Sequence, residues 1–169
     1  MVIGVDSEKN RYVLDYFRNR IPTFDLPDVI IRYANKYSPV RRVTIETVAA
    51  QEMVRDMTTR LAATDKRLVP GVFKGVKPPG GIKKQDRLET SLGPIVNSKK
   101  LYVRKTMTEL VDEFFEHPVS RHDDLMDALY YADYFARPPA SGRFDKGSDT
   151  INRVKKTFKK YNWLTGARS

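Results

Sequence analysis

The pattern of apolar and polar positions along the chain switches between the period of a strand and the period of a helix. Short runs rich in β-branched and aromatic residues predict strands at 2–5, 12–17, 42–46, 68–73 and 101–104. Apolar residues three and four positions apart predict helices at 25–37, 48–61, 84–92, 107–116 and 123–136. Strands and helices thus alternate over most of the chain, which predicts an α/β fold with a mixed sheet flanked by helices.

Two local features refine this prediction. Residues 6–10 are polar, and they are few enough to form the loop of an antiparallel hairpin. In the predicted helix at 48–61, Ala49, Met53, Met57 and Leu61 lie four apart on one stripe. Because an amphipathic helix turns its apolar stripe inward, we expect this stripe to face the core.

The composition changes at 137–142, where Pro, Ala, Ser and Gly follow one another. We therefore expect a globular domain over 1–136 and a tail over 137–169. The tail holds nine Lys or Arg and two Asp, so a net charge of +7 lies in its 33 residues. Its apolar residues fall on one helical face and its lysines largely off that face, which predicts a basic amphipathic helix. That face contains Ile151, Val154, Phe158 and Tyr161.

The composition of the chain limits which partners and which kinds of site it can have. The chain of 169 residues has 31 Lys or Arg against 21 Asp or Glu, and a net charge of +10 favours a polyanionic partner, either nucleic acid or an acidic lipid surface. It has no apolar run of the ~20 residues that span a bilayer and no signal-peptide pattern, so we expect a soluble, intracellular protein. The absence of cysteine excludes disulfides, a thiolate nucleophile and Cys-ligated zinc, and two histidines cannot form a three-His zinc site. The chemistry of the chain must therefore come from oxygen ligands.

Carboxylates gather at two places. Glu46 ends a predicted strand, where ligands bind in open α/β sheets, although it could instead complement the dipole of the following helix. Asp123, Asp124 and Asp127 open another helix, and Asp123 could simply cap it. Asp124 and Asp127 are three residues apart and repel unless a cation lies between them. Mg²⁺ or Mn²⁺ would fit such oxygen donors, and in a basic protein this suggests a phosphodiester substrate.

Four segments occur in a distinctive order and together resemble the C-terminal nuclease domain of the large terminase subunit of tailed bacteriophages. They are YVLDYFRNR at 12–20, VTIETVAAQ at 43–51, KQDRLETSLGPIVNSKKLYV at 84–103 and HDDLMDAL at 122–129. The resemblance covers about residues 1–136. It implies an RNase H-like fold and an endonuclease with two Mg²⁺ or Mn²⁺ ions that cuts concatemeric double-stranded DNA during packaging. By this likeness Glu46 is the second acidic ligand and either Asp123 or Asp124 is the last.

The chain departs from that family in its first residues. In the family, a strand ending in a catalytic Asp precedes the hairpin that resembles residues 2–17, and here that strand is missing. Asp6 could take the role of this Asp, as in another RNase H-like nuclease or resolvase, but it fits a hairpin turn better. A further alternative is a catalytically incomplete fragment that only binds DNA or the portal. The chain also lacks a G-x-x-x-x-G-K-[ST] loop, so we expect the ATPase domain upstream or in trans.

The remaining candidate residues have open roles. Asp127 is either a direct metal ligand or a supporting partner. Lys83, Lys84 and Arg87 follow a Pro-Pro-Gly-Gly loop and either contact the DNA backbone or form a solvated helix face. His122 either contacts phosphate or a bound water, or is structural.

The resemblance also bears on partners and location. The 137–169 tail could grip DNA electrostatically, dock to the portal or procapsid, or lie on a membrane surface. The resemblance favours docking to the portal or procapsid with DNA contact, and the few bulky residues on the apolar face make a membrane the weakest of the three. It further implies a phage or prophage protein in the cytoplasm of its bacterial host.

Overall fold

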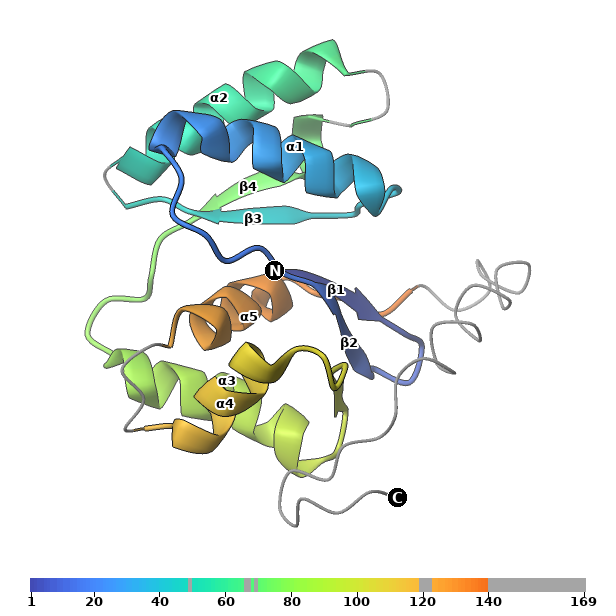
Figure 1. Cartoon of the computed structure of the whole chain (residues 1–169), viewed down its shortest axis with the longest axis vertical. Coiled ribbons are helices and arrows are strands. Elements are labelled where there is room, and N and C mark those ends of the chain that lie inside the picture. The colour runs from blue at the N-terminus through green and yellow to red at the C-terminus, as the bar shows by residue number, and fades with distance from the viewer. Residues whose placement is uncertain (49, 66–67, 69, 119–122, 140–169) are drawn as a thin grey trace. The chain divides into compact units, whose positions relative to one another are not determined.

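The order of strands and helices agrees with the sequence prediction. The computed structural model describes residues 1–48, 50–65, 68, 70–118 and 123–139 (Figure 1). The strands are β1 (Val2–Val5), β2 (Arg11–Asp15), β3 (Val43–Glu46), β4 (Phe73–Val76) and β5 (Leu101–Tyr102). The helices are α1 (Leu26–Lys36), α2 (Ala50–Thr64), α3 (Lys84–Asn97), α4 (Thr108–Glu116) and α5 (Asp124–Tyr134), with 3₁₀ turns at Thr23–Asp25 and Pro70–Val72. The α/β class is therefore confirmed.

The chain divides into two compact units. Unit 1 consists of Met1–Phe17 and Ile82–Ser169, and unit 2 is the intervening segment Arg18–Gly81. The five strands form two small sheets, one in each unit, where the sequence predicted one mixed sheet. Among the described residues, β1 forms its backbone hydrogen bonds with β2, and β3 forms its own with β4. The sheets are separate because no strand pairing of the described residues joins the two pairs.

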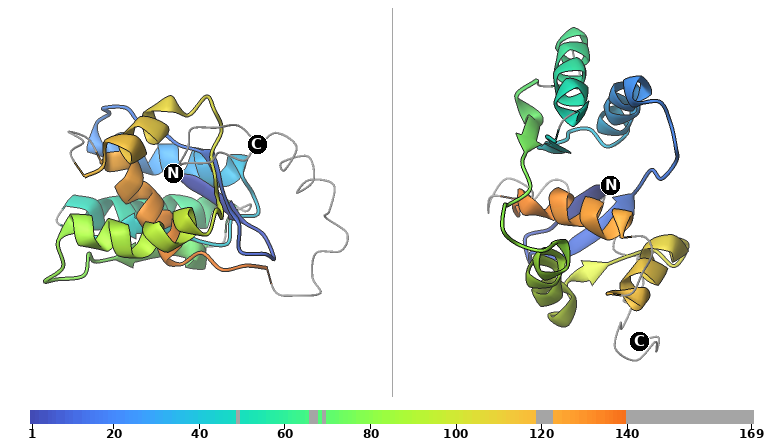
Figure 2. Two further views of the ribbon diagram at one scale, coloured as in Figure 1. Left: turned by 90° about the horizontal axis from the view of Figure 1, so that it is seen from below. Right: turned by 90° about the vertical axis from the view of Figure 1, so that its left-hand side faces the viewer.

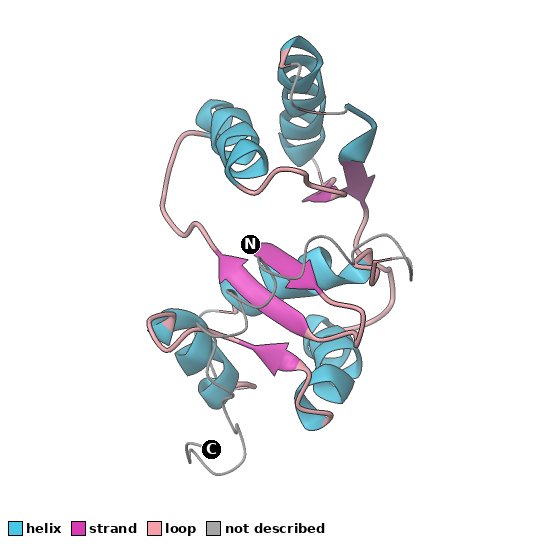
Figure 3. Cartoon of the chain, turned by 90° about the vertical axis from the view of Figure 1, so that its right-hand side faces the viewer, coloured by secondary structure: helices cyan, strands magenta, loops and turns pink. Residues whose placement is uncertain are grey.

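Unit 1 contains a mixed sheet in the order β1-β2-β5 (Figure 3). β1 and β2 are antiparallel, and the predicted hairpin loop at 6–10 joins them. β2 and β5 are parallel, which places Tyr12 beside Tyr102 with the ring centroids 4.9 Å apart. Helix α5 crosses one face of this sheet.

Both ends of α5 are attached to other elements of unit 1. At its C-terminal end Asp133 forms an ion pair with Arg11 of β2, with Nε and Oδ1 2.9 Å apart. At its start, backbone N–H groups donate to the side chain of Glu113 in α4. Leu129 on its inner face is fully buried, as are Leu88 of α3 and Leu110 of α4. The packing of α3, α4 and α5 thus fixes where the first residues of α5 lie.

Unit 2 is a β-α-β arrangement with one additional helix. β3 and β4 are parallel neighbours, in the register Val43 to Phe73, and α2 connects them. Helices α1 and α2 lie side by side over one face of this pair (Figure 2). Ala34 of α1, Ala62 of α2 and Ile45 of β3 form the buried core together with Phe73.

The buried face of α2 differs from the prediction. Val54, Thr58 and Ala62 are the buried side chains, whereas Met53 and Leu61 are 39% and 38% exposed. The predicted stripe is therefore wrong by one position, a rotation of about 100° around the helix axis. Small and β-branched side chains thus form the buried face of α2, and the longer Met53 and Leu61 side chains lie outside it.

Two element boundaries also differ. The fourth strand is Phe73–Val76 rather than 68–73, since Pro70 begins a 3₁₀ turn and cannot donate a ladder hydrogen bond. Helix α3 continues to Asn97, past the predicted end at residue 92, although Pro94 lies inside it. Ile95 and Val96 stay half-buried, so packing keeps this last turn helical.

No helix in the described part of the chain is both long and apolar enough to cross a bilayer. Residues 140–169 lie outside the described residues, so the helix and the docking role expected for the tail remain predictions.

Candidate functional site

Three carboxylates lie at the start of α5, as the sequence predicted. Asp123 is the N-cap residue, and Asp124 and Asp127 are in the first turn. The carboxylate of Asp123 makes no capping hydrogen bond to the helix. The alternative that Asp123 simply caps α5 is therefore wrong, and its side chain contacts helix α3 instead.

Two cations of α3 pair with these carboxylates. Lys84 Nζ is 2.8 Å from Asp123 Oδ1 and 3.6 Å from Asp127 Oδ2. Arg87 Nη2 donates a 2.7 Å hydrogen bond to Asp127 Oδ1. Both cations lie on the same side of α3, because residues three apart in a helix are neighbours. The structure thus brings together four of the predicted site residues within unit 1.

The two cations differ in their surroundings. Arg87 is 9% exposed, and its guanidinium carbon lies 4.8 Å from the ring centroid of Tyr130 and 5.5 Å from that of Tyr131. Burial acts to lower the pKa of Arg87, but the charge of Asp127, the hydrogen bond to it and the nearby Tyr131 and Tyr130 together raise that pKa. The Lys84 side chain is 40% exposed. Burial also acts to lower its pKa, yet the hydrogen bond to Asp123 and the charge of Asp127 raise it overall.

A buried carboxylate from α4 positions the carboxylates of α5. Glu113 is 3% exposed, and its Oε2 accepts hydrogen bonds from the backbone N–H groups of Leu125 (2.9 Å) and Met126 (3.1 Å). These are two of the N–H groups that a helix leaves without an internal partner at its start. Glu113 is not among the site residues predicted from the sequence. Its signal was an acid three positions after the buried Leu110, on the apolar face of α4.

The donors at the α5 start suit a hard dication only in part. Carboxylate oxygens are the ligands that Mg²⁺ and Mn²⁺ prefer, and Asp123 and Asp124 are accessible to solvent. Within the described ranges, however, no three acidic or histidine side chains gather into a group that could hold a metal. A dication bound here would have to replace Lys84 beside Asp123 and Asp127, and it would need a further ligand.

Glu46 is at the C-terminal end of β3, as predicted, in register with Val76 of β4. The next residue continues the pairing, since the N–H of Thr47 donates to the carbonyl of Val76 at 2.8 Å. Glu46 belongs to unit 2 and the aspartates of α5 to unit 1. Since each unit is described by itself, a shared site of Glu46 with Asp123 or Asp124 remains a prediction.

Asp6 is a structural carboxylate of the hairpin loop. It is 4% exposed, and its two oxygens accept hydrogen bonds from the backbone N–H groups of Glu8 and Asn10, the Asn10 amide and the Tyr12 hydroxyl, all between 2.9 and 3.1 Å. Three donors from the loop and one from β2 occupy the oxygens that a metal would need. This geometry supports the hairpin interpretation of Asp6 over the first-ligand interpretation.

The other predicted DNA contacts have different positions. Lys83 is the N-cap of α3 and its side chain is exposed. Lys84 and Arg87 direct their charges to Asp123 and Asp127, so Lys83 is the most accessible of the three cations. His122 lies outside the described residues.

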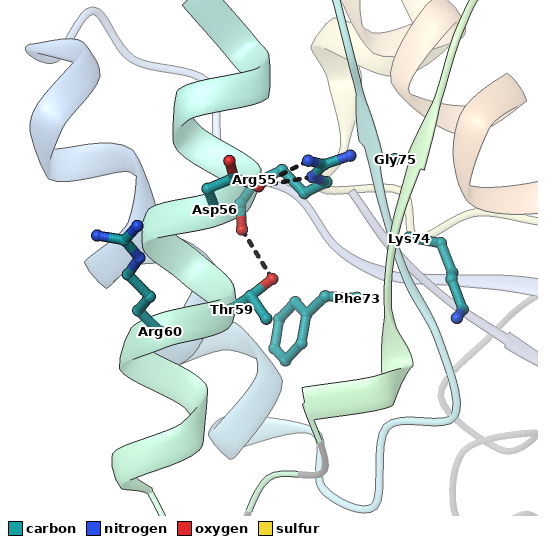
Figure 4. Close-up of a pocket in the computed structure, with 7 residues that line it drawn as sticks. All are labelled: Arg55, Asp56, Thr59, Arg60, Phe73, Lys74 and Gly75. Atoms are coloured by element: carbon teal, nitrogen blue, oxygen red, sulfur yellow. Dashed lines mark hydrogen bonds and ion pairs between the residues drawn. The ribbon is translucent and has the colours of Figure 1, made fainter.

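Unit 2 has a shallow cavity of about 470 Å³ between α2 and β4, which contains none of the predicted site residues. In Figure 4 Phe73 points toward α2 and Lys74 extends away from it. Arg55 donates from Nε and Nη2 to Asp56 Oδ1, at 3.0 and 2.7 Å, and lies against Gly75. A Cβ at residue 75 would be 3.0 Å from Arg55 Cδ and 2.6 Å from Thr47 Cγ2, so glycine is needed for this close approach.

Comparisons with known proteins give no relatives: the chain matches no protein-family model, no curated protein and no solved structure.

Proposed function

We propose that this chain is the nuclease domain of a DNA-packaging terminase and cuts double-stranded DNA by metal-assisted phosphodiester hydrolysis. The observation that carries the proposal is the set of carboxylates at the start of α5, directly beside cations of α3. Asp123 and Asp127 are held within hydrogen-bond or ion-pair distance of Lys84 and Arg87. An acidic set of this kind in a chain of net charge +10 suits a dication that acts on a phosphate.

The strand arrangement supports the RNase H-like part of the proposal. The resemblance places a further strand against β1 and against β3, and it is this strand that carries the first acidic ligand in the family. In the described residues β1 is at the edge of its sheet and β3 is at the edge of its own. An edge strand leaves backbone N–H and C=O groups available for another strand.

Asp123 or Asp124, together with Glu46, would hold the Mg²⁺ or Mn²⁺ ions. When bound, these ions lower the pKa of the attacking water and stabilise the leaving oxygen. The chain's own residues then have distinct roles. Glu113 fixes the start of α5, Arg87 keeps Asp127 in place, and exposed Lys83 is available to a backbone phosphate.

The test is cleavage of supercoiled plasmid with Mn²⁺ or with EDTA. We expect nicking and linearisation by the wild type in Mn²⁺, and a loss of at least about 100-fold in Glu46→Ala and Asp124→Ala. Asp86→Ala is the matched control, because Asp86 is an exposed acid of α3 close to the site. Cleavage that persists in EDTA or in Glu46→Ala would overturn the metal mechanism.

A second candidate is a fragment that binds DNA or the portal without cutting. The observation that favours it is that Lys84 and Arg87 neutralise Asp123 and Asp127. This candidate predicts that the chain binds duplex DNA in EDTA. In Lys83→Met, the slope of log affinity against log salt concentration should then become shallower by about one, because one phosphate contact is lost. Binding without cleavage in any divalent metal would select this candidate.

A further inference from the structure

The cavity between α2 and β4 of unit 2 is surrounded by an excess of positive charge. It has a volume of about 470 Å³, and none of the α5 carboxylates lines it. Three cations and one acid do, which gives the lining a net charge of +2: Arg55, Arg60, Lys74 and Asp56. A concave surface that gathers one sign of charge attracts ligands of the opposite sign. The cavity therefore suits an anionic ligand.

The three cations differ in whether a carboxylate already neutralises them. Arg55 donates from Nε and Nη2 to Asp56 Oδ1, and its Nη2 lies 3.7 Å from Glu52 Oε1. Arg60 and Lys74 are exposed, and neither forms an ion pair with a residue that the structure describes. The charge of Arg55 is thus used within its own helix, while Arg60 and Lys74 are the cations available to a ligand.

The directions of these two side chains fit an extended anion better than a compact one. Figure 4 shows that Arg60 extends from α2 and Lys74 from β4, in different directions. A compact anion such as inorganic phosphate would need side chains that converge on one point. A nucleic-acid backbone carries its phosphates at regular intervals, so separate cations can each contact a different phosphate. A guanidinium can donate two parallel hydrogen bonds to a phosphate, and an ammonium acts as a point charge.

The apolar part of the cavity lining narrows the kind of polyanion. Phe73 is the apolar side chain among the described lining residues, and it is only 6% exposed. Sites for single strands combine cations with exposed aromatic rings that stack on bases, and membrane-surface helices combine them with exposed apolar side chains. This lining offers neither. It therefore favours a double helix, whose bases are paired and whose phosphates face outward.

We propose that this cavity binds the phosphate backbone of a nucleic-acid duplex, with Arg60 and Lys74 each contacting one phosphate. The contact is independent of base sequence, because phosphates carry no sequence information. Asp56 weakens it by its negative charge. This inference goes beyond the proposed function, because it places a binding site in unit 2 that requires neither a metal nor cleavage.

The experiment measures the fluorescence anisotropy of a short labelled duplex titrated with the full chain, in EDTA and at several salt concentrations. Arg60→Gln and Lys74→Met each remove one cation of the cavity. Arg32→Gln is the matched control, because Arg32 is an exposed cation of α1 that does not line the cavity. Asp56→Asn removes the acid of the lining and should act in the opposite direction.

We expect the slope of log affinity against log salt concentration to become shallower by about one in Arg60→Gln and in Lys74→Met. Their affinities should fall about three- to tenfold at about 0.1 M salt. Arg32→Gln should keep the wild-type slope and stay within about twofold of the wild-type affinity. Asp56→Asn should bind about two- to fivefold more tightly.

Equal slopes in Arg60→Gln, Lys74→Met and Arg32→Gln would overturn the inference, and so would weaker binding in Asp56→Asn. Either result would leave the nuclease proposal standing, because that proposal is tested by cleavage. No duplex binding by the wild type would also overturn the inference.

Two further arms identify the source of the phosphates. A DNA duplex and an RNA duplex of the same sequence distinguish the two kinds of backbone, and a loss of binding to either in the cavity variants supports the inference. Phosphatidylglycerol vesicles test a lipid headgroup. If Arg60→Gln and Lys74→Met weaken vesicle binding and leave duplex binding unchanged, the cavity is a lipid contact and the inference is wrong.

Far-ultraviolet circular dichroism shows whether each variant is folded, which we expect because the substituted side chains are exposed. If Arg60→Gln does not fold, Lys74→Met and Asp56→Asn carry the comparison, since their expected effects have opposite signs.

Discussion

The buried Glu113 gives the sharpest test of how the site is held. Its Oε2 accepts the N–H groups of Leu125 and Met126 at 2.9 and 3.1 Å, and the side chain is 3% exposed. Glu113→Gln keeps the shape of the side chain and removes the charge. Each hydrogen bond then falls from the charged range of about 1.5–3 kcal/mol to the neutral range of about 0.5–1.5 kcal/mol. The favourable interaction of a carboxylate with the helix N-terminus, about 0.3–2 kcal/mol, is also lost.

The neutral amide also avoids the desolvation cost of a buried charge, which offsets part of these losses, so we expect a net decrease of about 2 kcal/mol in the free energy of unfolding for Glu113→Gln. Glu113→Ala should cost more, about 3–5 kcal/mol, because it leaves two N–H groups and a cavity in the core. A typical domain has a free energy of unfolding of about 5–15 kcal/mol, so losses of this size are a large part of the total. Since Asp123 and Asp124 belong to the same helix end, we also expect Glu113→Gln to weaken Mn²⁺ binding.

Urea unfolding followed by far-ultraviolet circular dichroism measures the effect. Asp112→Asn is the control, because Asp112 precedes Glu113 in α4 and is exposed. It should change the free energy of unfolding by no more than about 0.5 kcal/mol. The reasoning fails if Glu113→Gln is as stable as Asp112→Asn, since the two charge-assisted bonds would then contribute nothing measurable.

Two further predictions concern stability. Burial and the hydrogen bond to Asp6 raise the pKa of Tyr12 above its usual value of 10.0, so above about pH 10 the unfolded chain releases this proton before the folded chain does. The free energy of unfolding should therefore decrease as the pH rises above 10. Tyr12→Phe should reduce this decrease in alkaline titrations followed by circular dichroism. If the decrease with pH is the same in Tyr12→Phe as in the wild type, Tyr12 is not its cause. Gly75→Ala should lower the free energy of unfolding by about 1–3 kcal/mol, because its Cβ would meet Thr47 at 2.6 Å. Gly80→Ala, which has open space around it, is the control in the same denaturation assay, and equal effects would refute the steric argument.

The location of the candidate site could be predicted in part. Asp123, Asp124 and Asp127 were identified because three acids open an amphipathic helix, and that helix begins where expected. Their cationic partners were also singled out, but as DNA contacts. Sequence spacing places Lys84 and Arg87 on one side of α3, and it does not say that α5 packs against that side.

The sequence by itself determined the class and order of the secondary structure. Runs of β-branched residues and the three- and four-residue spacing of apolar positions act locally, so they predicted five strands and five helices in the observed order. Tertiary structure decided which faces and which charges meet. It buried Val54, Thr58 and Ala62 instead of the predicted stripe of α2, and it placed Glu113 under the start of α5. The physical reason is that close packing and the pairing of buried charges depend on neighbours that are distant in the chain, which no local pattern records.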